Sequence, residues 1–334
     1  MKRALTLAGL IFSLHMMAQD STMNKLTGDM DNKKVEKMPV KIFGSERLIN
    51  ANTNEIVPKG KMDFKVTHNF GDIGGTQGGL KNFFGLDAST DVRIGFHIGL
   101  SNRLNLNIAH IKGDEQTFRG DSIVRDFSLR RLYEVALKYQ LLRQYENDPT
   151  HPVAITLFMN TVVSTMPAAK SGVPPNPIIP NKVNSFSNFS DRLSMVYQAI
   201  IARKFKSVSI QLDPTLVHYN YVPSYSDKNT FALGGAMRVP VSKSMAVIVD
   251  YFHSFISDTK KNNYRILQGV EFHDALGIGL EILTAGHTFH MNFTNTTAIL
   301  ENQFLPHNTS SWGKGQFRWG FDLSRTFVLW REKK

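Results

Sequence analysis

The fold is decided by the stretch Val92-Arg93-Ile94-Gly95-Phe96-His97-Ile98-Gly99-Leu100. Apolar residues occupy every second position, and polar residues or glycines lie between them. Because successive side chains of a β-strand point to opposite faces, this pattern predicts a strand with one apolar and one polar face. The stretch is also longer than the strands of globular proteins, which typically have about five or six residues.

The same period recurs along most of the chain, in twelve segments. They are 62–70, 91–100, 104–112, 132–144, 153–165, 192–205, 208–220, 230–242, 245–254, 276–283, 287–295 and 316–329. A tilted strand that crosses a membrane needs about 9–11 residues, and most of these segments have that length or more.

The connections between the segments alternate in length. The long ones are 71–90, 113–131, 166–191, 221–229, 255–275 and 296–315, and the short ones are 101–103, 145–152, 206–207, 243–244 and 284–286. Outer-membrane barrels have short periplasmic turns and longer exterior loops. With an even number of strands, both termini are expected on the periplasmic side.

We therefore predict an all-β protein, a transmembrane antiparallel β-barrel of about 12 strands, since a sheet in lipid must close to satisfy its backbone groups. Aromatic residues near strand ends fit the interfacial girdles of such barrels. They are Phe70, Tyr133, Tyr219, Phe231, Phe327 and Trp330. Pro214 falls inside one segment, where we expect a bulge. The alternative is a soluble exported β-sandwich or adhesin-like domain, which segment length and loop alternation disfavour.

The first residues indicate export. Lys2 and Arg3 precede an apolar core at 4–14, and Ala18 is a small residue at the expected cleavage point. We predict a signal peptide at 1–18, a flexible periplasmic lead-in at 19–42, and an outer-membrane barrel at 43–334. The absence of cysteine excludes disulfides, thiolate metal sites and a lipoprotein anchor.

The net charge of +11 does not indicate a nucleic-acid partner, because the basic residues are scattered and no binding motif is present. The expected partners are outer-membrane lipid, a small solute and a periplasmic protein.

Several short blocks in a fixed order carry a family resemblance. They are Arg47-Leu48-Ile49-Asn50, Pro58-Lys59-Gly60, Asp63-Phe64, His68, Phe70-Gly71, Phe84-Gly85-Leu86-Asp87, Arg93-Ile94-Gly95, Gly277-Ile278-Gly279-Leu280-Glu281, Gly286-His287, Phe293-Thr294-Asn295 and Gly320-Phe321-Asp322-Leu323-Ser324-Arg325. They resemble domain of unknown function 5777, an outer-membrane β-barrel family of Bacteroidetes-type bacteria. The resemblance implies a barrel from about 43 to 330, and it implies no activity and no catalytic residues.

No motif for a catalytic, metal or cofactor site emerges. His287 and His290 are three residues apart, which places them on opposite faces of a strand. By the same alternation, His97 points inward, whereas His68 and His110 point outward. A lipid-active enzyme needs serine and histidine on one face, yet His253 is expected to face lipid and Ser254 the lumen. We expect neither an enzyme nor a bound cofactor.

The alternation assigns charged residues to the lumen. The acids are Asp63, Asp91, Glu134, Asp213, Asp250, Glu281 and Asp322, and the bases are Lys65, Arg93, Lys138, Lys204, Arg238 and Arg318. Nearly balanced charges in a confined space favour pairing across the lumen. A selective pore would show an excess of one sign, as charged rings do. The expected interior is therefore salt-bridged and narrow, without strong ion selectivity.

Three functions stay open at this stage. The first is a narrow pore, transporter or solute-binding barrel, and the second is a non-conducting barrel that has a structural or partner-docking role. The third and most distant is a lipid-active enzyme. Energised transport is not expected, because a plug domain needs on the order of 100 residues ahead of the barrel and the lead-in is shorter. The proline-rich loop 166–191 could fold inward or stand outward.

Overall fold

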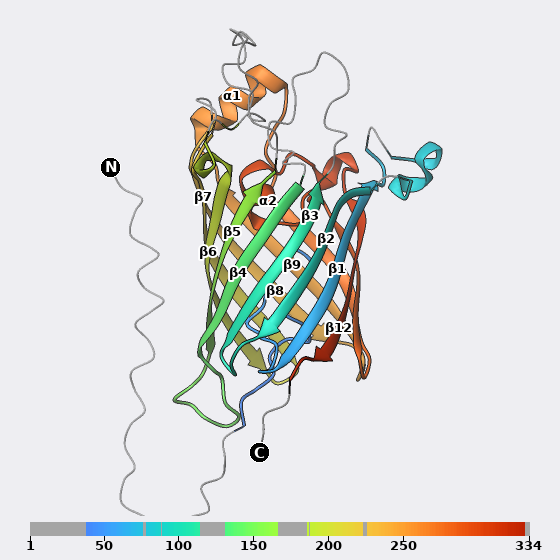
Figure 1. Cartoon of the computed structure of the whole chain (residues 1–334). Helices are drawn as coiled ribbons and strands as arrows, with labels where there is room; N and C mark the ends of the chain where they lie inside the picture. Colours follow the sequence, from blue (N-terminus) through green and yellow to red (C-terminus); the bar gives the residue numbers. More distant parts are fainter. Residues whose placement is uncertain are drawn as a thin grey trace, which may run out of the picture. The chain divides into compact units, whose positions relative to one another are not determined.

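The structure, a computed structural model, describes residues 38–75, 78–87, 89–113, 131–165, 186, 188–222 and 226–330. Within these residues, twelve strands form one closed antiparallel barrel, in which each strand pairs with its sequence neighbours and β1 closes against β12 (Figure 1). The predicted fold class is therefore confirmed. The predicted signal peptide, the lead-in as far as residue 37 and most of the proline-rich loop lie outside the described residues.

All twelve predicted segments coincide with strands, and their ends agree to within two residues. The strands are β1 Lys61–Asp72, β2 Ser89–Gly99, β3 Leu104–Gly113, β4 Arg131–Leu142, β5 Ala154–Ser164, β6 Leu193–Phe205, β7 Val208–Tyr219, β8 Asn229–Pro240, β9 Met245–Phe255, β10 Ala275–Leu283, β11 His287–Thr294 and β12 Arg318–Val328. We call the end with the short connections the turn end, and the opposite end the loop end.

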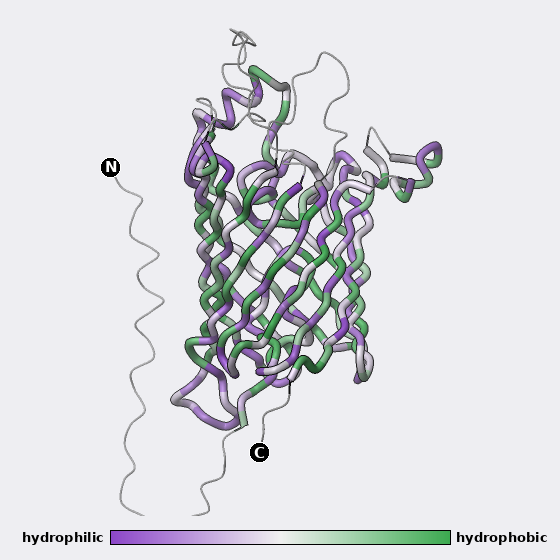
Figure 2. Tube along the Cα trace, viewed as in Figure 1, coloured by the Kyte–Doolittle hydropathy of each residue, from purple (hydrophilic) through white to green (hydrophobic). Residues whose placement is uncertain are grey.

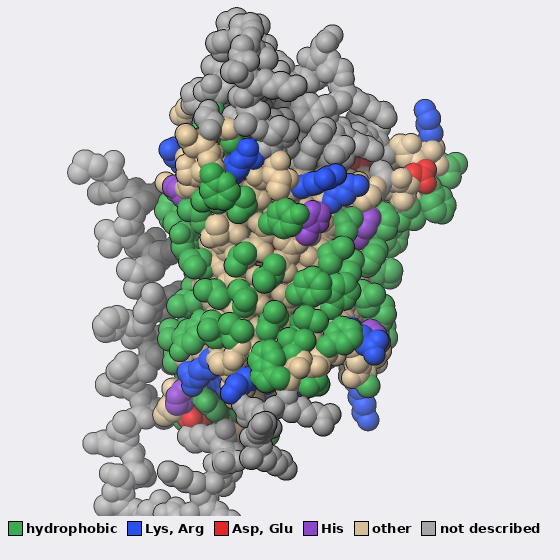
Figure 3. Space-filling model, viewed as in Figure 1, with side chains coloured by type: hydrophobic (Ala, Val, Ile, Leu, Met, Phe, Trp, Pro, Cys, Tyr) green, Lys and Arg blue, Asp and Glu red, His purple; other side chains and the backbone are tan. Residues whose placement is uncertain are grey.

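The two faces of the wall differ as the sequence period requires. On β4, Leu137 is 39% exposed on the outer face, whereas its neighbour Ala136 is buried. Hydropathy alternates along each strand (Figure 2). In the space-filling view, apolar side chains cover the middle of the outer wall, and lysine and arginine gather towards its two ends (Figure 3). This is the outer face expected of a barrel surrounded by lipid.

Two details of β7 differ from the sequence-based expectations. No bulge occurs at Pro214, because the register of β6 and β7 is the same on either side of it and only the local pairs are missing. Proline removes one ladder donor, and the flanking pairs hold the register without an inserted residue. The second is Tyr219, which was expected in an aromatic girdle. It lies on the inner face with Asp213 and is buried, so its assignment to the lipid side was wrong.

Short helices lie in the long connections. They are η1 Leu80–Gly85, η2 Ser190–Arg192, α1 Asp258–Gln268, α2 Glu301–His307 and η3 Trp312–Lys314. The hydroxyl of Ser257 accepts a hydrogen bond from Lys260 N at 3.1 Å and caps α1, and Gly269, with φ of 64°, ends it. No helix among the described residues is long and apolar enough to cross a membrane. In Figure 1, α1 lies beyond the loop end, whereas α2 lies within the barrel.

The residues before β1 do not join the wall. Residues 41–58, which we call the lumen hairpin, enter the barrel from the turn end and fold back on themselves (Figure 1). Leu48 N donates to Ala51 O, and Thr53 N to Glu46 O, both at 2.9 Å, which closes the tip of the hairpin. Gly60, with φ of 74°, then turns the chain into β1. The stretch expected to open the barrel at residue 43 therefore begins inside it, and the first strand starts at Lys61.

Candidate functional site in the barrel lumen

The thirteen charged residues that the sequence assigns to the lumen lie on nine of the twelve strands, β1, β2, β4, β6, β7, β8, β9, β10 and β12. Eleven of them are at most 8% exposed, namely Asp63, Lys65, Asp91, Arg93, Glu134, Lys138, Asp213, Asp250, Glu281, Arg318 and Asp322. Lys204 and Arg238 are partly buried. A closed barrel of this size leaves a narrow interior, so charges on different strands approach one another.

Three arginines of the wall pair with carboxylates of the wall. Arg93 Nη2 lies 2.8 Å from Glu134 Oε2, and Arg238 Nε lies 2.5 Å from Glu281 Oε1. Arg318 Nη2 lies 2.6 Å from Asp72 Oδ1, an acid that the sequence reasoning had not selected. The remaining bases and acids do not follow the expected pattern of pairing across the lumen, because much of the lumen is filled by the hairpin.

Asp250 on β9 holds the tip of the lumen hairpin. Its Oδ2 accepts the backbone N–H groups of Ile49 at 3.0 Å, Asn50 at 2.7 Å and Ala51 at 3.0 Å. Its Oδ1 accepts the side-chain amide of Asn50 at 2.8 Å. A lone buried carboxylate is costly, and these four donors satisfy it without a basic partner. The bonds fix the hairpin tip to one side of the wall.

Lys138 and His97 hold the two arms of the hairpin on the opposite side. Lys138 Nζ donates to the carbonyl oxygens of Glu46 at 2.9 Å and Glu55 at 3.1 Å. His97 Nδ1 lies 2.8 Å from the carboxylate of Glu46. The hairpin is therefore anchored by β2 and β4 on one side of the barrel and by β9 on the other.

A second segment enters the lumen from the loop end and meets the hairpin. Glu301, the first residue of α2, accepts from Arg47 Nη1 at 3.0 Å and from Asn52 Nδ2 at 2.9 Å. Asn302 accepts from Asn160 Nδ2 at 3.0 Å and donates to Ser194 Oγ at 3.0 Å, which fixes α2 to the wall. The hairpin and α2 therefore meet inside the lumen.

His290 forms a third contact region between the hairpin and the wall. Its Nε2 lies 3.3 Å from Glu281 Oε2, and its Nδ1 lies 3.4 Å from Asp322 Oδ2. Ser45 Oγ of the hairpin lies 3.3 Å from the same Nε2. Gly44 lets the hairpin approach this group closely, because a Cβ at this position would displace the Glu281 carboxylate.

The wall formed by β11, β12, β1, β2 and β3 retains buried polar atoms without a hydrogen-bond partner among the described residues. Among them are Lys65 Nζ, Arg93 Nη1, Asn107 Oδ1 and Asn292 Oδ1. Because buried polar groups are normally paired, these atoms mark a strip of the lumen whose hydrogen bonding is incomplete. At the turn end, a cavity of about 390 Å³ lies between the hairpin and the wall, with Glu55, Gln140 and Arg143 in its lining.

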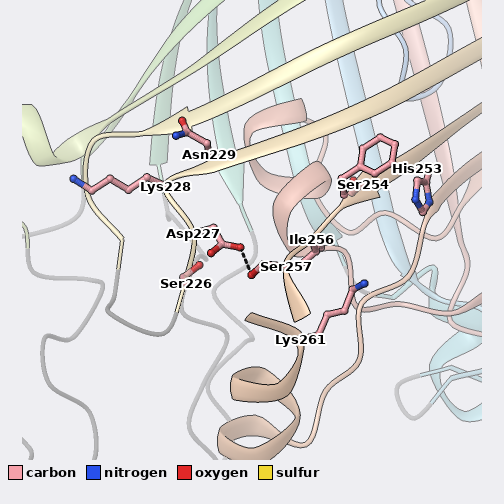
Figure 4. A pocket seen from close by; sticks show the side chains of 10 residues that line it. Ser226, Asp227, Lys228, Asn229, His253, Ser254, Ile256, Ser257 and Lys261 are labelled. Atoms are coloured by element: carbon pink, nitrogen blue, oxygen red, sulfur yellow. Dashed lines mark hydrogen bonds between the residues drawn. The ribbon is translucent and has the colours of Figure 1, made fainter. Parts of the chain in front are cut away.

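The histidines and the rim of the barrel are the remaining candidates for chemistry. His97 points inward as predicted, and His290 is also buried on the inner face. Among the described residues no cluster of three or more His, Asp or Glu side chains could hold a metal ion. At the loop end a pocket of about 600 Å³ is lined by residues that include His253, Ser254 and Ser257 (Figure 4).

This rim pocket lacks the arrangement of a serine hydrolase. His253 Nδ1 lies 2.9 Å from Asp274 Oδ2. Burial raises the pKa of Asp274, but hydrogen bonds from His253 and Tyr251 outweigh it and hold that pKa below its usual value. Ser257 Oγ instead donates to Asp227 Oδ2 at 2.7 Å (Figure 4). Within the described part of the chain, no serine hydroxyl is hydrogen-bonded to His253, so the pair has no nucleophile to activate.

A family model described as a membrane-bound β-barrel domain, DUF5777, matches residues 43–327. The chain belongs to this family. The match spans the lumen hairpin as well as the strands, so the hairpin is part of the DUF5777 domain and not an extension of it. The resemblance found in the sequence blocks is thereby confirmed at the level of the family.

Solved structures similar to this DUF5777 barrel are outer-membrane proteins of low sequence identity. The COG4313 outer-membrane channel of Pseudomonas putida F1 has a TM-score of 0.46 and 11% identity over 82% of this chain and 98% of that chain. The NanC porin has a TM-score of 0.43 and 10% identity over 79% and 98%. Omp33 of Acinetobacter baumannii has a TM-score of 0.36 and 9% identity over 80% and 98%. A search of curated proteins gives no match.

Sequence reasoning missed the two segments that fill the DUF5777 lumen. One signal for a buried hairpin is present in the sequence. The segment ahead of the first strand contains four apolar residues that are buried in the structure, namely Ile42, Phe43, Leu48 and Ile49. A second signal was Asp250, an inward carboxylate on a strand. Neither signal says which segment fills the lumen, because the partners are about 200 residues apart in sequence.

Proposed function

We propose that this protein is an outer-membrane channel for small polar solutes, closed in this conformation by the lumen hairpin and α2. The observation that carries the proposal is the polar strip along β11, β12, β1, β2 and β3, where buried donors and acceptors lack protein partners. A barrel whose only role was structural could pair these polar groups with one another. Retained polar groups on one continuous wall suit a path for water and polar solutes.

The orientation follows from the loop lengths. Short connections of outer-membrane barrels face the periplasm, so the turn end and the entry of the lumen hairpin belong there. A cleaved signal peptide is proposed to deliver the chain, and N-terminal sequencing of the membrane-extracted protein should then begin near Gln19. Recovery of intact Met1 from the cytosol would contradict export. The Bacteroidetes-type origin that the resemblance implies stays a prediction.

A vesicle-swelling assay tests passage. Vesicles that contain the purified protein are diluted into an isotonic solution of a small polar solute, and swelling reports its entry. We expect slow swelling with solutes of the size of glycerol or glycine and none with trisaccharides. Entry of the trisaccharide at the same rate would indicate a wide pore, and no entry of any solute would contradict the channel.

A second function, a non-conducting barrel that docks a periplasmic partner, is favoured by one observation. Arg47 and Glu301 interlock the hairpin with α2, and Leu48 and Leu300 are fully buried beside this contact. A permanently filled lumen would leave only the outer surfaces for function. The swelling assay separates the two, because a docking barrel would show no solute entry even when the hairpin is released.

A lipid-active enzyme is not proposed. The histidine nearest to such a role, His253, is on the outer face at the rim, and Asp274 is the one acid of the described residues that pairs with it. Incubation of the folded protein with phospholipid micelles should release no fatty acid.

A further inference from the structure

Lys65 is a buried cation without a partner in the described structure. It lies in the middle of β1, points into the lumen and is 1% exposed. Its Nζ has no hydrogen bond, and no carboxylate among the described residues is close enough to form a salt bridge with it. An ammonium group that is buried without a partner is strongly unfavourable. A bound anion would supply the partner that this ammonium lacks.

Arg93 on the neighbouring strand β2 brings a second cation to the same place. Its Nε and Nη2 bind Glu134 Oε2 at 3.0 Å and 2.8 Å, but its Nη1 has no partner. Gly95 is directly opposite Lys65 in the ladder. A Cβ at Gly95 would be only 2.6 Å from Arg93 Nη1, so the guanidinium lies over this glycine and beside Lys65.

A hydroxyl completes the arrangement from the other side. Ser324 on β12 pairs with Lys65 across the β1–β12 ladder and is buried. Ser324, Lys65 and Gly95 therefore lie in a row on three adjacent strands. Their inward groups are an alcohol, an ammonium and the guanidinium of Arg93 above the glycine.

The carboxylates near this row are occupied by other partners. Glu134 is held by Arg93 and by Asn160 Nδ2 at 3.1 Å. Glu46 of the hairpin is bound to His97, and Asp322 faces His290. None of the three reaches Lys65 Nζ or Arg93 Nη1. The two cationic donors are therefore left for an anion that the described residues do not supply.

We propose that Lys65, Arg93 and Ser324 around Gly95 form a binding site for an oxyanion, the carboxylate or phosphate group of a small solute. The proposal rests on the channel function in one respect, because the solute must reach the site through the lumen. The guanidinium and the ammonium supply charge, and the missing side chain at position 95 leaves space for the guanidinium to lie beside Lys65. The site narrows the solute class of the channel to small organic or inorganic anions.

Titration calorimetry on the folded full-length protein in detergent tests the site. The probes are inorganic phosphate and acetate, which distinguish a phosphate site from a carboxylate site. We expect one of them to bind, and Lys65→Met to weaken that binding at least tenfold, the loss expected for one charge-assisted bond. Gly95→Ala should weaken it as well by displacing the guanidinium. Lys65→Arg should retain binding.

Lys112→Met is the matched control, because Lys112 is an exposed lysine on β3. It should leave binding unchanged. Each variant is first checked for the gel shift between unboiled and boiled samples that a closed barrel gives, and Gly95→Ala takes the place of any lysine variant that fails to fold. Absence of binding by both probes, or equal binding by wild type and Lys65→Met, would overturn the site. Binding without solute entry would instead overturn the channel and leave the site standing.

Discussion

Neutralising Asp250 should release the lumen hairpin. Its carboxylate accepts four hydrogen bonds from residues 49–51 of the hairpin, at distances between 2.7 and 3.0 Å. Hydrogen bonds to a charged group contribute about 1.5–3 kcal/mol each, and neutral ones are roughly half as strong. At the lower end, the four bonds stabilise the docked hairpin by about 6 kcal/mol, and Asp250→Asn removes about half of this. A loss of about 3 kcal/mol raises the undocked fraction about 100-fold.

The chain contains no cysteine, so a single introduced cysteine reports the undocked state without background. Ala51→Cys places a thiol at a position that is fully buried in the docked hairpin. The rate of its reaction with a water-soluble maleimide then measures how often the hairpin leaves its site. We expect Asp250→Asn to raise this rate by about 100-fold.

Asp63→Asn is the control for this experiment. Asp63 is also a buried carboxylate of the inner wall, but it accepts a hydrogen bond from Thr326 and none from the hairpin. It should leave the labelling rate of Ala51→Cys unchanged. Equal rates in wild type and Asp250→Asn would refute the reasoning that Asp250 anchors the hairpin. Equal acceleration by both variants would show that the effect is general loosening of the barrel.

Three further predictions concern the hairpin contact, the lipid face and α1. Arg47→Met leaves the buried Glu301 without its basic partner, so it should reduce the free energy of hairpin docking by about 3–5 kcal/mol. The double variant Arg47→Met with Glu301→Gln should recover part of this loss in the same labelling assay. Additive losses from the two substitutions would argue against the pair. Leu137→Arg, on the outer face of β4, should destabilise the barrel by about 2–4 kcal/mol in denaturant unfolding from vesicles, and an unchanged midpoint would contradict the assigned face. Burial lowers the pKa of Lys260 in α1 to about 8, below the value of about 10.4 in an unfolded chain. Between these two pH values the folded loop has lost the proton that the unfolded loop still binds. The stability of the folded loop should therefore increase by up to about 3 kcal/mol as the pH rises from about 8 to 10.4. Protease resistance of α1 in wild type relative to Lys260→Met should therefore increase over that range, and a constant ratio would contradict the low pKa.

The wall of the barrel could be predicted almost completely from the sequence. A period of two reports which face each residue occupies, and strand length and loop alternation then identify a membrane barrel. The strand β4, for example, has its predicted bounds to within two residues, and Glu134 and Lys138 lie inside as assigned. The error at Tyr219 came from treating an aromatic near a strand end as interfacial, although its own alternation with Asp213 places it in the lumen.

The contents of the lumen could not be predicted in the same way. Periodicity gives the face of a residue but not its partner, so charge balance along the strands suggested pairs within the wall. In the structure, Lys138 binds carbonyl oxygens of the hairpin, and Asp250 binds its N–H groups. Both are contacts between side chains and a backbone far away in sequence. No local pattern encodes such contacts, and they are the ones that hold the hairpin in the lumen.

Planar-bilayer recording of wild type and Asp250→Asn shows whether the hairpin controls passage, because it measures the flow of ions through the lumen while the hairpin is docked or released. We expect small and infrequent openings in wild type, and larger and longer ones in Asp250→Asn, with Asp63→Asn like wild type. A stable, large, porin-like open state in the unmodified protein, or an equal absence of current in all three proteins, would contradict it.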